Sequence, residues 1–107
     1  MKVLRIEAMK FTAGSWEDVG PALKKVKAQG KASAFPKVKF YSSISGGDTM
    51  HTLYLISEWE SLAAMEQLEA KAAGKKGLME AIEALSKVVD SSEVILLKQL
   101  TAKDLGI

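Results

Sequence analysis

A single histidine is the side chain of this sequence best suited to proton transfer near neutral pH. His51 is the only histidine among 107 residues, and an unperturbed imidazole titrates at about pH 6.5. It stands near the start of a strand-like segment, just after a turn signal. A general base at that position needs a partner side chain that orients it, and the sequence shows none. A catalytic role and a structural role therefore both stay open for His51.

A charged pair near the start of the chain is the second candidate. Arg5 and Glu7 are two residues apart, so in a strand they lie next to each other on one face. That face also carries Val3, Met9 and Phe11. If it lines the interior of a dimer, the two charges would be buried or half-buried. A structural ion pair is the favoured interpretation, and binding of a substrate is the alternative.

Aromatic side chains supply a third candidate, a surface for a ligand. Trp59 ends an apolar strand pattern directly before a helix cap, and Tyr54 lies in the same pattern. Small-molecule sites are mostly apolar with a few polar groups. The predicted ligand-binding residues are therefore Trp59, Tyr54, His51, Arg5 and Glu7, with ordinary core packing as the alternative for each aromatic ring.

The composition excludes several other classes of function. The chain has no cysteine, which removes thiolate metal ligands and cysteine nucleophiles. One histidine and scattered carboxylates do not form a metal site. Fifteen basic residues balance 13 acidic ones, for a net charge of +2, which argues against a nucleic-acid partner. No apolar run approaches the roughly 20 residues that span a bilayer, and no signal peptide is recognisable. We expect a cytoplasmic protein without a membrane partner.

The elements that must position these candidates follow from periodicity and turn signals. Ser45 to Asp48 marks a hairpin turn, and Gly74 to Gly77 interrupts the second helical stretch. We expect strands at residues 2–11, 37–44, 50–58 and 93–100, a first helix from an N-cap at Asp18 to about Gln29, and helical segments at residues 62–73 and 78–89. This order is the βαββαβ pattern of the ferredoxin-like α+β fold, with a four-stranded antiparallel sheet and its helices on one face. The whole chain, residues 1–107, is expected to be one domain.

Helix ends have their own signals. Pro21 is tolerated only in the first turn of a helix, which favours Asp18 over Ser15 as the N-cap of the first helix. Gly30 is expected to end that helix. Ser61 is expected to cap the second one.

The last expected strand is apolar on both faces, which points to assembly. Residues 94–97 read Val-Ile-Leu-Leu, whereas a sheet with one wet face should alternate apolar and polar residues. Helices cover one face only, so the other would expose a large apolar patch. A second copy, packed face to face, is the simplest cover. The alternative is that the C-terminal tail folds over that face.

The junction from the third strand to the second helix resembles a known group of proteins. Residues 58–66 read Glu-Trp-Glu-Ser-Leu-Ala-Ala-Met-Glu and resemble that junction in the dimeric α+β barrel superfamily, which includes the antibiotic-biosynthesis-monooxygenase-like and NIPSNAP-like proteins. The resemblance implies a homodimer whose two sheets form a barrel. In many relatives an organic molecule occupies a pocket between sheet and helices. The superfamily includes cofactor-free oxygenases, haem-degrading enzymes and many proteins of unassigned role.

Two functions are compatible with this resemblance. The first is a homodimeric barrel protein that binds a small apolar organic molecule or oxidises it without a cofactor. The alternative is a non-catalytic module for self-association or partner binding. Haem degradation is disfavoured: relatives that perform it use a first-strand asparagine and a helix histidine, and this chain has no asparagine and no histidine at residues 62–89. Trp59 alone matches their tryptophan, so no cofactor is expected.

Overall fold

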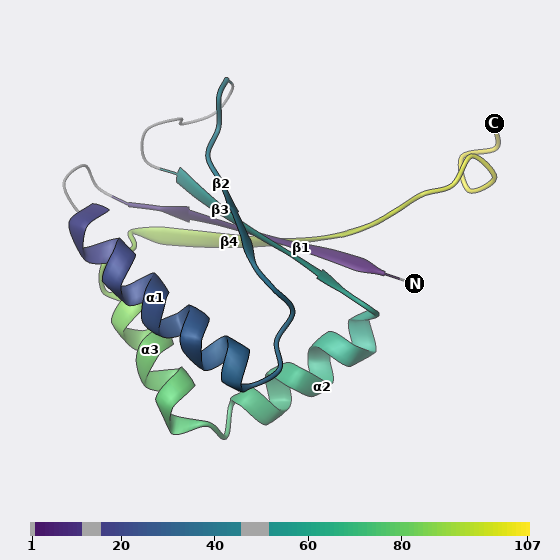
Figure 1. The fold of residues 1–107 in the computed structure, drawn as a ribbon. Helices are drawn as coiled ribbons and strands as arrows, with labels where there is room; N and C mark the ends of the chain where they lie inside the picture. The colour runs from purple at the N-terminus through teal and green to yellow at the C-terminus, as the bar shows by residue number, and fades with distance from the viewer. Residues whose placement is uncertain (1, 12–15, 46–51) are drawn as a thin grey trace.

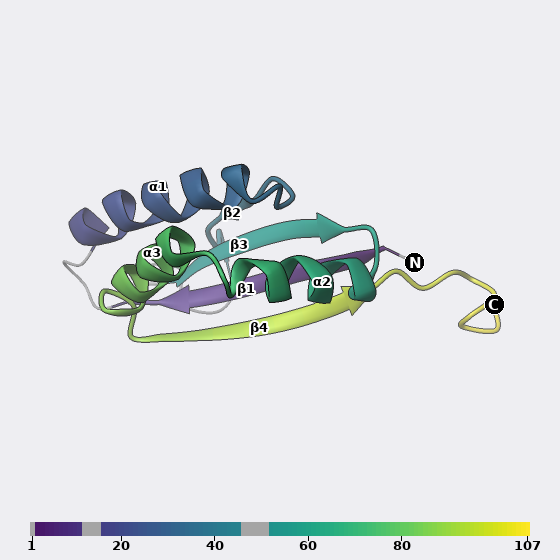
Figure 2. The ribbon, with the colours of Figure 1, turned by 90° about the horizontal axis from the view of Figure 1, so that it is seen from below.

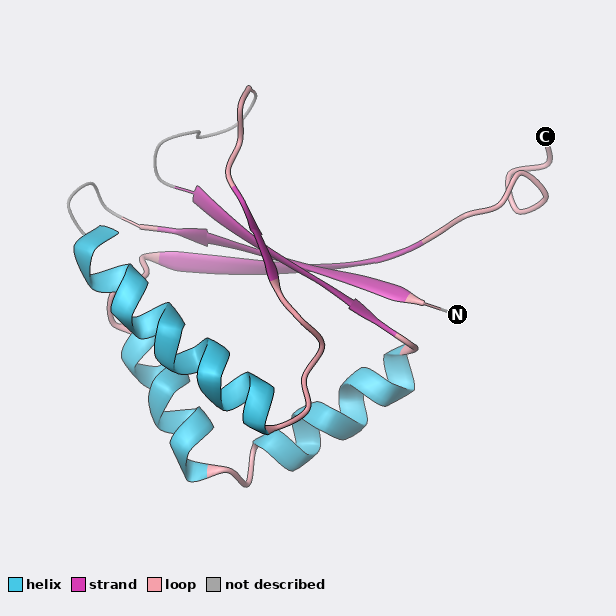
Figure 3. Cartoon of the chain, in the orientation of Figure 1, coloured by secondary structure: helices cyan, strands magenta, loops and turns pink. Residues whose placement is uncertain are grey.

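The computed structural model describes residues 2–11, 16–45 and 52–107. In chain order the elements are β1 (Val3–Lys10), α1 (Trp16–Ala32), β2 (Lys39–Tyr41), β3 (Thr52–Trp59), α2 (Leu62–Ala72), α3 (Lys76–Ser86) and β4 (Ser91–Lys98) (Figure 1 and Figure 3). The predicted order of strands and helices is confirmed, including the division of the second helical stretch into α2 and α3.

The four strands form one antiparallel sheet in the order β2-β3-β1-β4. All three helices lie on the same side of this sheet (Figure 1). We call that side the helix side and the other the open face. The register places Ile6 of β1 opposite Ile56 of β3 and Ile95 of β4. This is the predicted ferredoxin-like α+β arrangement.

The core lies between the sheet and the helices because odd-numbered positions of β1 and β3 point to the helix side. Met9 and Leu53 pack there with Val19 of α1 and Leu85 of α3 in one cluster. A smaller cluster at the other end of β1 contains Val3, Trp59 and Met65, with Phe35 and Leu68 against it. The two clusters hold α1 and α3 over one end of the sheet and α2 over the other.

Helix α1 begins earlier than the sequence predicted. It starts at Trp16, so Asp18 lies inside the first turn and the predicted N-cap at Asp18 is wrong. Glu17 and Asp18 are both acidic first-turn residues, which is where the partial positive charge of a helix N-terminus favours carboxylates. Pro21 lies in the second turn, where it has no N–H to donate to the carbonyl of Glu17. Ser15, the other predicted cap, lies outside the described residues.

The end of α1 also differs from the prediction, because Gly30 does not stop the helix. The chain turns at Ala34, whose φ is +61°. The Phe35 N–H donates to the Gly30 carbonyl at 3.0 Å, and the Ala34 N–H donates to the Lys31 carbonyl at 3.2 Å. These two bonds form a Schellman motif with alanine at the position that glycine usually occupies. A Cβ atom at Gly30 would lie in ordinary van der Waals contact with Phe35, 3.7 Å from its ring, so the packing there does not require glycine.

Strand β2 is much shorter than predicted. Within the described part of the predicted strand at residues 37–44, Lys39–Tyr41 alone pair with β3, at the edge of the sheet, where short strands with charged residues are common. The predicted hairpin turn lies mostly outside the described residues. Beyond β4, residues 99–107 extend away from the body (Figure 2), and every one of them is exposed. The interpretation that this tail covers the open face is therefore wrong.

Candidate functional site

The charged pair of β1 lies on the helix side of the sheet. Arg5 Nη1 donates to Glu7 Oε1 at 3.1 Å, as the spacing of the two residues predicted. A second carboxylate comes from α2, where Glu69 Oε1 lies 3.9 Å from Arg5 Nε. The side chains of Arg5 and Glu7 are 25% and 18% exposed, so the pair is partly shielded from water yet still reachable from solvent.

The neighbours of this pair differ on its two sides. On β3, Arg5 lies opposite Ser57 and Glu7 opposite Leu55, and both of these neighbours are buried. On β4, the opposite residues are Leu96 and Val94, which are 44% and 47% exposed. We call Arg5, Glu7, Glu69, Val94 and Leu96 the ion-pair site. It combines a half-buried charged group with an exposed apolar surface on the edge strand.

Trp59 lies two residues after Ser57 on β3 and is a core residue. Its side chain is 6% exposed, and its indole N–H donates to Ser57 Oγ at 2.9 Å. Phe35 meets the indole ring edge-on, with centroids 5.6 Å apart and an interplanar angle of 62°. Ser61 starts α2 directly after it, because its hydroxyl accepts the Ala64 N–H at 3.0 Å. Trp59 thus supports Ser57, which lies opposite Arg5, and its own ring faces the core.

The structure brings together only part of the predicted site. Arg5 and Glu7 meet, and Trp59 is linked to them through Ser57. Tyr54 lies on the open face, opposite Ala8 of β1 and Tyr41 of β2. His51 lies outside the described residues. The predicted ligand-binding residues therefore occupy two faces of the sheet.

Three members of the ion-pair site were not among the predicted residues. Val94 and Leu96 belong to a strand that the sequence marked as apolar on both faces, but nothing in the sequence showed that they would lie opposite Arg5 and Glu7. Glu69 follows Met65, a buried residue of α2, by four positions. That spacing puts Glu69 on the same side of α2 as Met65. It was the one sequence feature that could have predicted Glu69 as a member of the ion-pair site.

The open face carries apolar residues from three strands. Leu4 lies opposite Leu97, and Ile6 lies between Ile56 and Ile95. Ile95 and Leu97 are 42% and 44% exposed. We call the following residues the open-face patch: Leu4, Ile6, Tyr54, Ile56, Ile95 and Leu97.

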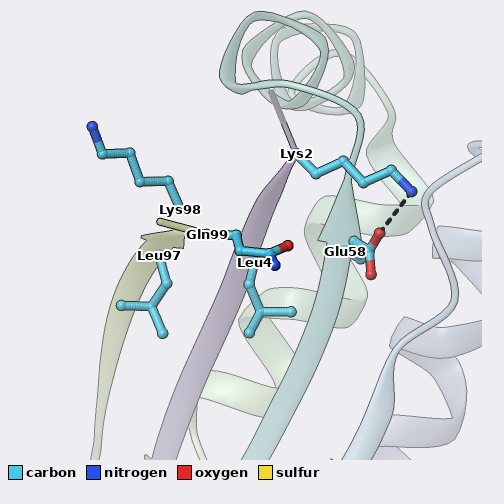
Figure 4. Close-up of a pocket in the computed structure, with 6 residues that line it drawn as sticks. All are labelled: Lys2, Leu4, Glu58, Leu97, Lys98 and Gln99. Atoms are coloured by element: carbon cyan, nitrogen blue, oxygen red, sulfur yellow. Dashed lines mark ion pairs between the residues drawn. The ribbon is translucent and has the colours of Figure 1, made fainter. Parts of the chain in front are cut away.

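A shallow hollow of about 370 Å³ lies at one end of the open-face patch, between Leu4, Leu97 and Gln99 (Figure 4). Its rim carries Lys2 and Glu58, whose Nζ and Oε1 atoms are 3.0 Å apart. The hydrogen bond to Glu58 raises the pKa of Lys2 above its usual value. A second hollow, of about 340 Å³, lies between α1 and α3. Arg5 and Glu7 line neither of them.

In the described part of the chain, no three histidine, cysteine or acidic side chains gather closely enough to hold a metal ion. No helix in the described ranges has both the length and the apolar character needed to cross a membrane.

The sequence matches no protein-family model, and comparison with curated proteins found no match. Solved structures, in contrast, share the fold. A NIPSNAP family protein from Agrobacterium tumefaciens superposes with a TM-score of 0.76 at 14% identity, covering 97% of this chain and 90% of that one. A second NIPSNAP family protein of unknown function from the same organism gives 0.75 at 11% identity, covering 92% and 87%. An uncharacterized NIPSNAP domain protein from Burkholderia xenovorans gives 0.70 at 12% identity, covering 92% and 94%.

These likenesses define the class of the protein by its fold. It is an α+β protein with a ferredoxin-like sheet. Within that class it has the fold of NIPSNAP family structures, which confirms the resemblance predicted from residues 58–66. At such low identity the likeness shows the fold alone.

Proposed function

We propose that the protein works as a homodimer joined through the open-face patch. The observation that carries this proposal is the cross-strand row Ile56, Ile6 and Ile95 on a face without helices. Hiding about 600 Å² of apolar surface contributes on the order of 15 kcal/mol before the costs of association. This amount is large enough to drive dimerisation.

The residues around the patch suit the border of an interface. Lys10, Lys39, Glu58 and Glu93 occupy open-face positions near the strand ends and the edge strands, and all four are exposed. Stable interfaces have an apolar centre and a polar rim. A two-fold partner would place the two apolar centres together and leave these charges in water.

Adjacent residues of β4 offer a matched test. Leu96 and Leu97 are equally exposed, at 44% each, but Leu96 faces the helix side and Leu97 the open face. Wild-type protein should scatter light at about twice the chain mass of 11.6 kDa. Leu97→Glu should weaken the dimer at least about hundredfold, because it puts a charge from each copy into an apolar interface. Leu96→Glu should leave the dimer intact. A monomeric wild-type protein at micromolar concentration, or equal effects of both substitutions, would contradict the proposal.

A second function rests on the ion-pair site, which we propose binds a small, mostly apolar organic molecule. Val94 and Leu96 offer an exposed apolar surface, and Arg5 with Glu7 offers a charged group beside it. Such a combination fits a molecule with an apolar body and one polar end. Oxidation of that molecule would need, in addition, a base that reaches it. His51, the candidate from the sequence, lies outside the described residues.

The same two variants separate this function from dimerisation. A panel of small aromatic acids and phenols is titrated into methyl-labelled protein, and the methyl resonances of Val94 and Leu96 are followed. A ligand should shift these resonances and leave Ile56, on the open face, unchanged. Leu96→Glu should abolish binding, whereas Leu97→Glu should preserve it. The binding proposal fails if no compound shifts Val94 or Leu96, or if both variants bind equally well.

A further inference from the structure

The C-terminal arm, residues 99–107, is an apolar segment that leaves the body of the protein. It continues from β4 and runs away from both the sheet and the helices (Figure 1 and Figure 2). Leu100, Leu105 and Ile107 are 48%, 58% and 85% exposed. Three aliphatic side chains on one short projecting segment form an unusual surface for a protein in water.

The arm nevertheless has a defined local shape. The Thr101 N–H donates to Asp104 Oδ2 at 2.9 Å, and the Asp104 N–H donates to Thr101 Oγ1 at 3.1 Å. The Ile107 N–H closes the turn on the Ala102 carbonyl at 2.9 Å. Because the Asp104 carboxylate accepts the hydrogen bond from the Thr101 N–H, the pKa of Asp104 lies below the usual value. A segment that is already folded loses less conformational freedom when it docks.

We infer that the arm docks on a second copy of the chain, in the hollow at the end of the open-face patch. The hollow has apolar walls from Leu4 and Leu97, which point to the same side (Figure 4). Its volume of about 370 Å³ is that of a small ligand pocket. Leu105 and Ile107 are the arm's side chains that would enter it. This inference rests on the proposed homodimer.

The geometry explains why the arm would use the partner's hollow rather than its own. Gln99, the first residue of the arm, lines the hollow, and the arm then extends away from it (Figure 1). The C-terminal end of the arm therefore lies away from the hollow of its own chain (Figure 1). In a two-fold dimer each arm can fill the hollow of the other copy, so one contact occurs twice.

The position of the arm and its charges agree with this docking. The arm continues from the strand that supplies Ile95 and Leu97 to the open-face patch, so its contacts would extend the same interface. Lys2 and Lys98 outnumber Glu58 around the hollow, and Asp104 brings an exposed carboxylate to that rim. Opposite charges around an apolar contact favour the correct partner orientation.

The dissociation constant of the dimer tests the inference. Sedimentation over a dilution series should show that the double substitution Leu105→Ser and Ile107→Ser raises this constant at least about tenfold, because two aliphatic side chains no longer leave water. Lys103→Ser, a polar change in the same turn, should leave it within about twofold. Because the arm extends away from the body, circular dichroism should show the same fold in all three proteins. An unchanged constant in the double variant overturns the inference.

A second measurement identifies what the arm touches. The chain has no cysteine, so Ala102→Cys gives a single attachment point for a nitroxide. This labelled chain is mixed with a methyl-labelled wild-type chain. The nitroxide should broaden the Leu4 and Leu97 methyl resonances of the other copy and spare Leu85, in the core. A dimer without this broadening overturns the arm contact but not the homodimer, whereas a monomeric wild-type protein overturns both.

Discussion

At the scale of single residues, the Arg5–Glu7 pair shows why a buried charge needs its partner. The 3.1 Å contact joins two side chains that are less than a third exposed. Such a pair contributes little compared with an apolar pair of the same volume, yet breaking it leaves one charge partly buried without compensation. The Arg5–Glu7 pair is therefore better suited to holding a polar group in place than to stabilising the fold.

Replacement of Arg5 should reveal this asymmetry. Arg5→Met keeps the length of the side chain but leaves Glu7 and Glu69 without their shared cation, and should lower the free energy of unfolding by about 1 to 2 kcal/mol. The double variant Arg5→Met and Glu7→Leu should recover most of the loss. Urea denaturation at neutral pH measures both. Equal stabilities of the single variant and the wild type would mean that the pair is fully screened by water.

The residues of the site also show what a sequence can predict. Arg5 and Glu7 belong to one strand, where a spacing of two places side chains together. Tyr54 and Trp59 are five positions apart in β3, an odd number, so strand alternation puts them on opposite faces; the prediction of one shared site, made with a strand that ended at residue 58, overlooked this. Glu69 reaches Arg5 only because α2 packs over the sheet, and this tertiary contact has no local signature.

At the scale of elements, the helix ends divide into those with a side-chain signal and those without one. The Ser61 cap was predicted and is confirmed, because its hydroxyl binds the Ala64 N–H. The end of α1 was mispredicted, since Gly30 continues the helix and Ala34 turns the chain in the left-handed region. Alanine is uncommon in that conformation, so no local sequence signal predicted the turn at Ala34.

Ala34 is consequently a site where glycine should improve stability. The left-handed conformation costs alanine about 1 kcal/mol, and the greater freedom of glycine in the unfolded chain offsets about half of that. Ala34→Gly should raise the free energy of unfolding by about 0.5 kcal/mol. Ala32→Gly, at the last residue of α1, is the control and should lower it by up to about 1 kcal/mol. Chemical denaturation midpoints distinguish the two, and a destabilised Ala34→Gly would show that Ala34 is not strained.

At the scale of the whole molecule, the sheet is only partly covered by its own chain. The helices bury the odd-numbered side of β1 and β3, whereas β4 is exposed on both faces, with residues 94–97 all between 42% and 47% exposed. The open-face patch and the C-terminal arm add further apolar surface. These surfaces adjoin one another along β4. One partner copy could therefore cover the open-face patch and the C-terminal arm together.

This distribution predicts that the thermal stability of the protein depends on its concentration. If folding and association are coupled, raising the concentration from about 1 to about 100 micromolar adds about 2.7 kcal/mol per dimer. For a chain of this size such a gain shifts the melting temperature upward by several degrees. Differential scanning calorimetry at three or more concentrations measures the shift directly.

Three variants show which surface produces the shift of the melting temperature. Leu97→Glu should remove the concentration dependence, because its unfolding no longer includes dissociation. Leu96→Glu, equally exposed but on the helix side, should retain it. The double substitution in the arm, at Leu105 and Ile107, should keep a dependence but melt at a lower temperature than the wild type at each concentration, since the dimer persists with fewer contacts. A wild-type melting temperature that stays constant across the range would mean that the monomer is stable with its open face in water.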